Sequence, residues 1–223
     1  MADISKKLTL KYCGARSLED CEVIAESSAD VIGFVFAESK RKVTPQQVKR
    51  WSAVLPERMK KAGVFQDQPI TEVVNAARMS GMNIIQCHGS EEPHQLLQLK
   101  KQSGLIIFKA LKGNRDLVMS MKKYEGSADG YIVDSVKDSA FGGTGIAFDW
   151  SVVPEAVKEA NRQKVPLLVA GGISAGNAAS LLSYSPDGID VSSGIEDEEK
   201  KCRSRIQLLE RVIREYEKCE RAR

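Results

Sequence analysis

Two apolar stretches near the C-terminus show most clearly the pattern on which this chain is built: Leu167-Leu168-Val169-Ala170-Gly171-Gly172 and Gly188-Ile189-Asp190-Val191-Ser192-Ser193-Gly194-Ile195. Each run ends in a turn that contains glycine, and helix-forming sequence follows. A parallel strand buried on both faces has this pattern, because no polar alternation survives in it. Glycine there lets backbone N–H groups approach an anion, and a following helix N-terminus adds partial positive charge. We therefore expect the two turns to form a phosphate site; glycines that merely end strands are the alternative.

The same alternation of strand and helix runs through the whole chain. Strands are expected at 8–14, 29–36, 59–65, 84–89, 105–111, 130–135, 167–172 and 188–195. Helices are expected behind Ser17, behind Thr44-Pro45, and at 70–79, 93–102, 116–124, 150–162, 174–182 and 203–217. Eight such units predict a (β/α)8 barrel. An open doubly wound sheet is the competing fold, but the expected G-x-G-x-x-G turn does not follow the first strand.

Length and composition narrow the class of protein. A chain of 223 residues without a linker or low-complexity stretch predicts one barrel domain over residues 1–223. The 33 basic and 30 acidic residues nearly balance, so nothing favours nucleic acid or a membrane as partner. No apolar stretch approaches the roughly 20 residues of a membrane span, and the N-terminus is too polar for a signal peptide. Five scattered cysteines and two histidines predict reduced thiols in the cytoplasm and no metal site.

Barrel closure would gather the carboxyl ends of the strands on one face, where the active sites of such barrels lie. The polar residues at or just beyond those ends are Cys13, Arg41, Gln86, His88, Lys109, Asp134 and Asp190. The two glycine turns belong to the same face. The sequence therefore predicts one site that combines titratable and anion-binding groups.

Cys13 and Asp134 are the candidates for proton transfer. Lys11 lies two residues before Cys13 on the same strand face, and a cation there would favour a thiolate able to act as base or nucleophile. Asp134 ends an apolar strand, where burial raises a carboxyl pKa and suits it to general acid catalysis. The alternatives are a small buried hydrophobic cysteine and an aspartate that caps a helix or ties a loop.

Three further features have both a functional and a structural interpretation. Arg41 offers a planar guanidinium for a substrate carboxylate, although a solvated surface charge is the alternative. His88 is either a site residue or a structural histidine. Residues 136–148 are long and glycine-rich for a βα turn, which predicts a lid over the substrate or else a flexible surface loop.

Six motifs occur in order along the chain: Lys11-x-Cys13-Gly14; Gly33-Phe34-Val35-Phe36 with Ser39-x-Arg41-x-Val43; Gln86-x-His88-Gly89; Asp134-Ser135 with Gly142-Gly143-Thr144-Gly145 and Phe148-Asp149-Trp150; Ala170-Gly171-Gly172; and Val191-Ser192-Ser193-Gly194-Ile195-Glu196. Together they closely resemble the phosphoribosylanthranilate isomerases of tryptophan biosynthesis, from about residue 8 to residue 196. The sequence departs from that pattern at Lys40, where proline is usual, and at 197–201, where a Pro-Gly-x-Lys-Asp turn is usual.

The resemblance implies a (β/α)8 barrel that uses no metal or coenzyme. Its reaction would be the Amadori rearrangement of N-(5-phosphoribosyl)anthranilate to 1-(2-carboxyphenylamino)-1-deoxyribulose 5-phosphate. Asp134 would be the general acid that opens the ribose ring, and Cys13 the general base that removes the proton from ribose C2. Arg41 would face the anthranilate carboxylate, while His88 and Asp190 would line the site. The phosphate would be held by Gly143, Gly145, Gly172, Ser193 and Gly194.

Two alternatives remain open. The related isomerase of histidine biosynthesis performs the same rearrangement on a larger substrate. That family has aspartate rather than cysteine at the end of the first strand and a second phosphate cradle in the first half of the chain. Here Cys13 holds that position, and no second glycine-rich cradle follows the third or fourth strand. A barrel that only binds a sugar phosphate would need neither Cys13 nor Asp134. We therefore expect a cytoplasmic enzyme that acts, as a monomer or homodimer, on a small phosphorylated substrate.

Overall fold

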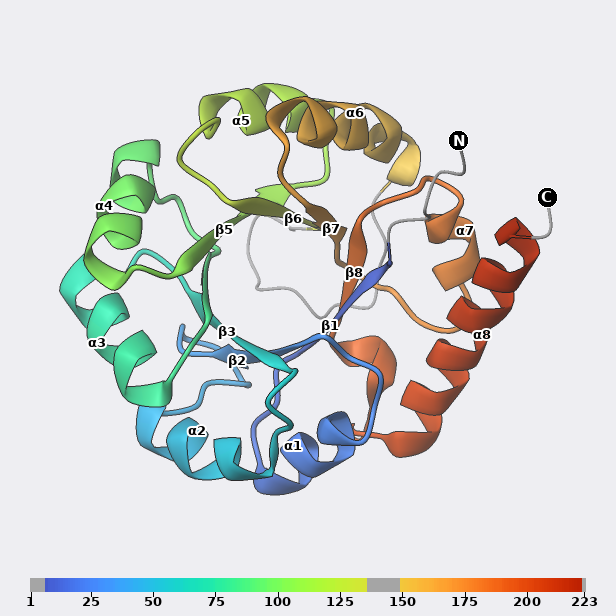
Figure 1. Cartoon of the computed structure of the whole chain (residues 1–223), viewed down its shortest axis with the longest axis horizontal. Coiled ribbons are helices and arrows are strands. Elements are labelled where there is room, and N and C mark those ends of the chain that lie inside the picture. Colours follow the sequence, from blue (N-terminus) through green and yellow to red (C-terminus); the bar gives the residue numbers. More distant parts are fainter. Residues whose placement is uncertain (1–6, 136–148, 222–223) are drawn as a thin grey trace.

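The computed structural model describes residues 7–135 and 149–221, in which strands β1 to β8 close into a parallel barrel. These strands are β1 (Thr9–Cys13), β2 (Val31–Val35), β3 (Lys60–Phe65), β4 (Ile84–Cys87), β5 (Ile106–Lys112), β6 (Gly130–Asp134), β7 (Leu167–Val169) and β8 (Gly188–Val191). The barrel closes through β8 and β1, where Lys11 is the register partner of Asp190. Figure 1 shows the strands as a central ring inside a ring of helices, so the expected (β/α)8 fold is confirmed.

The helices follow the strands in turn around the barrel (Figure 1). They are α1 (Leu18–Ala25), α2 (Pro45–Trp51), α3 (Ile70–Ser80), α4 (Pro93–Ser103), α5 (Leu117–Lys123), α6 (Val153–Gln163), α7 (Ala178–Leu182) and α8 (Arg203–Arg221), with 3-10 turns η1 (Ser52–Val54), η2 (Trp150–Val152) and η3 (Ser193–Ile195). The predicted caps are present: Ser17 accepts from the backbone N–H of Asp20, and Thr44 forms a capping box with Gln47.

The strands have two buried faces, which explains their nearly continuous apolar sequences. On one face, residues such as Tyr12 pack in the layer between barrel and helices. On the other, residues such as Ala62 and Ile132 fill the barrel interior. The interior also contains buried polar side chains, among them Gln86 and Asp190. A buried polar group needs a partner, so this part of the barrel is where a function is expected.

The segments behind the two glycine turns differ from expectation. The helix predicted at 174–182 begins only at Ala178, because the backbone N–H of Ser174 donates to the Asn177 side chain and forms a separate turn. Behind β8 the chain forms the 3-10 turn η3 and then a short hairpin, so the helix α8 begins only at Arg203. The expected helix N-termini directly behind both turns were therefore wrong. A turn closed by Asn177 and the 3-10 turn η3 occupy these places instead.

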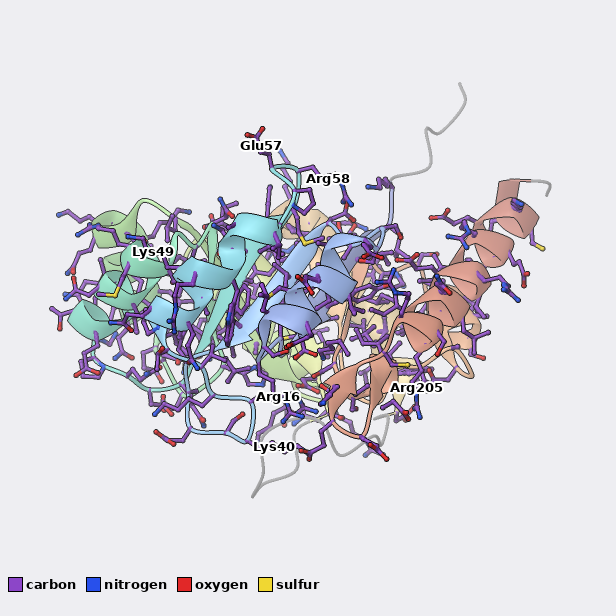
Figure 2. The ribbon with its side chains drawn as sticks, turned by 90° about the horizontal axis from the view of Figure 1, so that it is seen from below. Arg16, Lys40, Lys49, Glu57, Arg58 and Arg205 are labelled. Carbon is purple, nitrogen blue, oxygen red and sulfur yellow. The ribbon has the colours of Figure 1, made fainter. Side chains whose placement is uncertain are left out.

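A two-stranded antiparallel hairpin, β9 (Glu196–Asp197) and β10 (Lys200–Lys201), follows η3. Lys40 Nζ lies 2.6 Å from Glu199 Oε1 at the hairpin tip, and Arg16 also contacts Glu199. Figure 2 shows Arg16 and Lys40 side by side at this edge of the molecule. Two of the departures from the family pattern, at Lys40 and in the hairpin, therefore contact each other.

The segment 136–148, predicted as a lid, lies outside the described residues. Among the helices that are described, none combines the length and the apolar character that crossing a membrane requires.

Candidate active site

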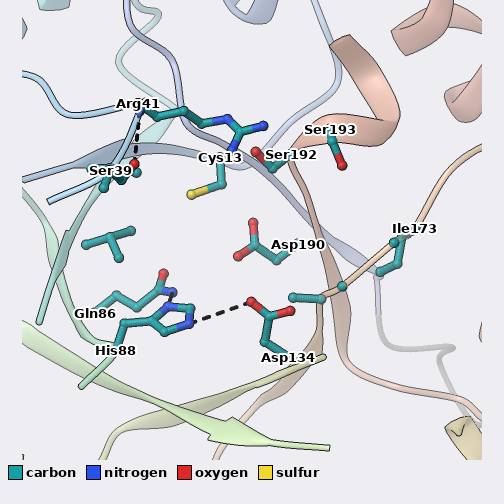
Figure 3. A pocket seen from close by; sticks show the side chains of 15 residues that line it. Cys13, Ser39, Arg41, Gln86, His88, Asp134, Ile173, Asp190, Ser192 and Ser193 are labelled. Atoms are coloured by element: carbon teal, nitrogen blue, oxygen red, sulfur yellow. Dashed lines mark hydrogen bonds and ion pairs between the residues drawn. The ribbon is translucent and has the colours of Figure 1, made fainter. Parts of the chain in front are cut away.

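A cavity opens at the carboxyl ends of the strands, and its empty volume of about 670 Å³ includes space that is open to solvent. Its lining residues come from β1 to β4, β6 and β8 and from the turns behind β2, β4, β7 and β8: Cys13, Val35, Ser39, Arg41, Val64, Gln86, His88, Asp134, Ala170, Gly171, Gly172, Ile173, Asp190, Ser192 and Ser193. Figure 3 shows Cys13, Asp134 and Asp190 pointing into the same space. The structure thus brings together the predicted thiol and carboxyl, which are far apart in sequence.

Cys13 lies at the end of β1, where its Sγ faces Gly33 of β2. A Cβ atom at Gly33 would lie only 2.6 Å from that Sγ, so the absence of a side chain at Gly33 makes room for the thiol. Burial raises the pKa of the Cys13 thiol, and the nearby ammonium groups of Lys11 and Lys201 offset this only in part. The expected lowered pKa was wrong, because desolvation outweighs the cations. Cys13 therefore rests as a thiol at neutral pH.

Lys11 forms a buried ion pair with Asp190, with Nζ 2.7 Å from Oδ2. The barrel register places the two residues side by side on β1 and β8. Burial lowers the pKa of Lys11, but Asp190 and Cys13 raise it more, so the side chain stays an ammonium ion. The predicted cation beside Cys13 is present, and it is ion-paired with Asp190.

Asp134 ends β6 and is buried, with 6% of its surface exposed. Burial raises the pKa of its carboxyl, although Ser135 and Lys11 act in the opposite direction. This is the environment predicted for a general acid. His88 Nε2 lies 3.6 Å from Asp134 Oδ2, and burial lowers the pKa of His88 to about 4, so its imidazole is neutral at pH 7.

Three buried oxygen atoms of this site have no hydrogen-bond partner among residues 7–135 and 149–221: Gln86 Oε1, Asp134 Oδ1 and Asp190 Oδ1. Buried acceptors are normally satisfied, and leaving one unpaired costs about 1–3 kcal/mol. All three residues line the same cavity. A ligand with several hydroxyl groups would supply the missing donors.

Arg41 is not a solvated surface charge, because only 6% of it is exposed. Its Nε and Nη2 donate to the two carboxylate oxygens of Glu196, at 3.0 and 2.7 Å. Lys201 Nζ lies 2.8 Å from the same carboxylate. Burial would raise the pKa of Glu196, but Arg41 and Lys201 together lower it to about 2. The guanidinium of Arg41 thus lines the cavity and is already bound to the carboxylate of Glu196.

The two glycine turns meet at the edge of the cavity, as the sequence predicted. A Cβ atom at Gly194 would lie 1.8 Å from the backbone oxygen of Ile173, so the turns are in direct backbone contact. Gly171 and Gly172 have positive φ angles of 82° and 66°, which favour glycine. Gly172 and Ser193 line the cavity and Gly194 supports it, whereas Gly143 and Gly145 lie outside the described residues.

Sequence reasoning missed Glu196 and Lys201 as parts of the site. Glu196 is the last residue of the motif that begins at Val191, but no feature of the neighbouring sequence identified Arg41 as its partner 155 positions away. Lys201 lies in a mixed charge run that is typical of a solvated turn, yet it is buried. Gln86 was noted only as a polar strand-end residue.

The closed barrel and the acid and thiol at its carboxyl-terminal mouth define a (β/α)8-barrel enzyme for proton-transfer chemistry on a small ligand. A family model described as "N-(5'phosphoribosyl)anthranilate (PRA) isomerase" matches residues 10–211. The N-(5'-phosphoribosyl)anthranilate isomerase of Geobacillus thermodenitrificans is 42% identical over 208 residues, covering 93% of this chain and 94% of that protein. The chain therefore belongs to the phosphoribosylanthranilate isomerase family.

Solved structures agree with this assignment. The phosphoribosylanthranilate isomerase of Thermotoga maritima superimposes with a TM-score of 0.82 at 26% identity, covering 94% of this chain and all of that one. A phosphoribosylanthranilate isomerase in complex with reduced 1-(o-carboxyphenylamino)-1-deoxyribulose 5-phosphate superimposes with a TM-score of 0.79, also at 26% identity, covering 94% of this chain and 100% of that chain.

Proposed function

We propose that this chain catalyses the Amadori rearrangement of N-(5-phosphoribosyl)anthranilate to 1-(2-carboxyphenylamino)-1-deoxyribulose 5-phosphate, with Asp134 as general acid and Cys13 as general base. One observation carries the assignment of roles: a carboxyl with a raised pKa and a thiol face one cavity at the carboxyl ends of the barrel strands. Sugar-phosphate binding alone would require neither group.

In the first step Asp134 donates its proton to the ring oxygen of the ribose. The bond between that oxygen and C1 breaks, and the anilino nitrogen supplies the electron pair that forms the protonated Schiff base. Asp134 becomes a carboxylate, which the neighbouring His88 and Lys11 stabilise. General acid catalysis of this kind contributes roughly 10²–10⁴-fold.

In the second step the thiolate form of Cys13, which is the minor form at neutral pH and arises when the thiol loses its proton to solvent, removes the proton from ribose C2. The electron pair of that C–H bond moves into the C1–C2 bond and neutralises the iminium nitrogen, giving an enolamine. The enolamine gains a proton at C1 and loses the C2 hydroxyl proton, which yields the ketone. Lys11 stabilises the thiolate that the step requires, since it opposes the effect of burial on the pKa of Cys13.

The phosphate and the anthranilate carboxylate of the substrate would contact two neighbouring parts of the cavity, the glycine turns and Arg41. Gly172, Ser193 and Gly194 are the proposed phosphate-binding residues of the described chain, with Gly143 and Gly145 of the adjoining segment completing the set. Arg41 would take the anthranilate carboxylate by sharing or exchanging its bond to Glu196. Asp190 and His88 would orient the ribose hydroxyls.

We also propose that the chain is one barrel domain that acts in the cytoplasm as a monomer or homodimer. One similar structure is described as monomers generated from the dimeric enzyme of Thermotoga maritima. Sedimentation of the purified protein would determine the oligomeric state.

The test is an anthranilate fluorescence assay in which the substrate is generated in situ. Wild type should remove the fluorescence of the substrate, and Cys13→Ser and Asp134→Asn should each lose most of the activity. Matched controls are Cys219→Ser and Asp116→Asn, which change exposed residues. Binding without turnover would favour the sugar-phosphate-binding barrel, and turnover of the histidine-pathway substrate alone would favour the related isomerase.

A further inference from the structure

Gln86, His88 and Asp134 form a connected row across the cavity (Figure 3). Gln86 belongs to β4 and is 1% exposed; His88 follows it by two residues and so leans to the same side. Gln86 Nε2 lies 3.1 Å from His88 Nδ1, and the opposite ring nitrogen, Nε2, faces Asp134 Oδ2 at 3.6 Å. The row therefore joins a side chain that has no place in the proton transfers to the general acid.

The chemistry of the amide decides which ring nitrogen of His88 carries hydrogen. An amide nitrogen only donates, so Nδ1 must present its lone pair to Gln86. A neutral imidazole with a bare Nδ1 carries its hydrogen on Nε2. Burial lowers the pKa of His88 to about 4, which keeps the ring neutral at pH 7. His88 then directs an N–H group toward Asp134.

We propose that Gln86 is a positioning residue that holds His88 as an Nε2–H donor to the carboxylate that Asp134 becomes when it protonates the ribose ring oxygen. This inference rests on the proposed role of Asp134 as general acid. A hydrogen bond that strengthens as negative charge develops lowers the barrier to ring opening. With the other tautomer, the lone pair of Nε2 would face the new carboxylate and oppose its formation.

Other charged groups around His88 are already engaged in ion pairs, so they do not set its tautomer. Lys11 pairs with Asp190 at 2.7 Å, and Lys109 with Glu91 at 2.9 Å. Lys109 also donates to the backbone oxygen of Gly89, directly after His88. These pairs fix the surroundings of the ring, while Gln86 contacts Nδ1 itself.

The first experiment reads the tautomer without any turnover. The chain contains only two histidines, so ¹⁵N-histidine labelling with the His94→Gln variant isolates the signal of His88. His94 is exposed on α4, and its removal should leave the activity unchanged. The expected spectrum is that of a neutral ring with hydrogen on Nε2. A hydrogen on Nδ1 would overturn the proposal, whatever the activity.

The second experiment uses Gln86→Glu, which keeps the size and shape of the side chain. A protonated Glu side chain donates O–H to Nδ1 as the amide does, whereas its carboxylate only accepts and draws the hydrogen to Nδ1. The kcat of the variant, divided by the kcat of wild type at the same pH, should fall roughly ten- to a hundredfold as pH rises. The midpoint of this fall should coincide with the pH at which the hydrogen of His88 moves from Nε2 to Nδ1. Gln86→Met, which cannot donate, should be slow at every pH.

The outcomes separate this inference from the proposed function. A constant kcat ratio for Gln86→Glu while the tautomer reverses would overturn the positioning role, even in an active enzyme. An inactive wild type with hydrogen on Nε2 would instead overturn the proposed function, and Gln86 and His88 would then have no role in catalysis. If Gln86→Glu fails to fold, the wild-type spectrum and the kcat of Gln86→Met still test the proposal. Hydrogen on Nδ1 in the wild type, or a wild-type kcat in Gln86→Met, would overturn it.

Discussion

Lys201 Nζ lies 2.6 Å from the backbone oxygen of Cys13, so a buried ammonium supports the end of the strand that carries the proposed base. The same nitrogen donates to the backbone oxygen of Ser192 at 3.2 Å and to Glu196 at 2.8 Å. Burial lowers the pKa of Lys201, and Glu196 opposes that change. One side chain thus joins β1, the turn behind β8 and the carboxylate that holds Arg41.

Lys201→Met should destabilise the protein and reduce kcat/KM, because it leaves two backbone oxygens without this donor and removes one of the two cations beside the buried Glu196. Breaking a buried ion pair on one side costs about 3–5 kcal/mol, and the remaining Arg41 contact should place the loss near the lower end. Urea unfolding measures it. Lys200→Met, at the exposed neighbouring position, is the control, and equal stability of the two variants would contradict the proposed support.

The tip of the β9–β10 hairpin is strained. Glu198 and Glu199 form its two-residue turn with φ angles of 44° and 64°, a geometry that favours Asn-Gly. Glu198→Asn with Glu199→Gly should stabilise the protein by about 1 kcal/mol, because the relieved strain exceeds the exposed ion pairs to Lys40 and Arg16 that are lost. Urea unfolding tests this, and a lower free energy of unfolding would show that those ion pairs dominate.

Gly33→Ala should remove activity with little loss of secondary structure. The added Cβ would lie 2.6 Å from Cys13 Sγ and would displace the thiol. A misplacement of about 1 Å in an active site can lower the rate about 10²-fold. Gly176→Ala, whose Cβ would meet nothing closer than 3.7 Å, is the matched control for kcat. Full activity of Gly33→Ala would argue against Cys13 as the base.

The pH profile of kcat/KM should be bell-shaped, with an acidic limb from Asp134 and an alkaline limb from Cys13. Burial raises both pKa values, so the acidic limb should lie above about 3.9 and the alkaline limb above about 8.5. At pH values below the pKa of Asp134 the acid is already fully protonated, and each further decrease in pH lowers the thiolate fraction of Cys13. At pH values above the pKa of Cys13 the thiol is fully ionised, and each further increase in pH lowers the protonated fraction of Asp134. An alkaline limb below 8.5 would contradict the raised pKa of Cys13.

Glu196 should make the protein sensitive to acid. The pKa of its carboxyl is about 2 in the folded protein, below its ordinary value of 4.5. Its contribution is therefore complete above about pH 5 and is lost as pH falls toward 2, roughly 3 kcal/mol in all. Urea unfolding between pH 6 and 3 should show a smaller decline in Glu196→Gln than in wild type. Glu155→Gln, at an exposed position, should decline like wild type.

Much of the fold was predictable because its signals are local. Apolar runs such as Val31–Val35 are sufficient to mark buried parallel strands, and caps such as Ser17 and Thr44 mark helix starts. The prediction failed at 174–177, where the Asn177 side chain bonds to the backbone of Ser174 and delays the helix. Competition between side chain and backbone is decided by geometry that the sequence pattern does not contain.

Strand and helix patterns in the amino-acid sequence were enough to predict the barrel and to place Cys13 and Asp134 at its carboxyl-terminal face, since the ends of parallel strands must share one edge. How those groups are charged and held could be seen only in the folded chain. Arg41 bonds to Glu196 rather than to solvent, Lys201 lies beneath Cys13, and burial outweighs Lys11 in setting the pKa of the thiol. Solvation and ion pairing depend on distances between residues remote in the chain, and folding alone sets those distances.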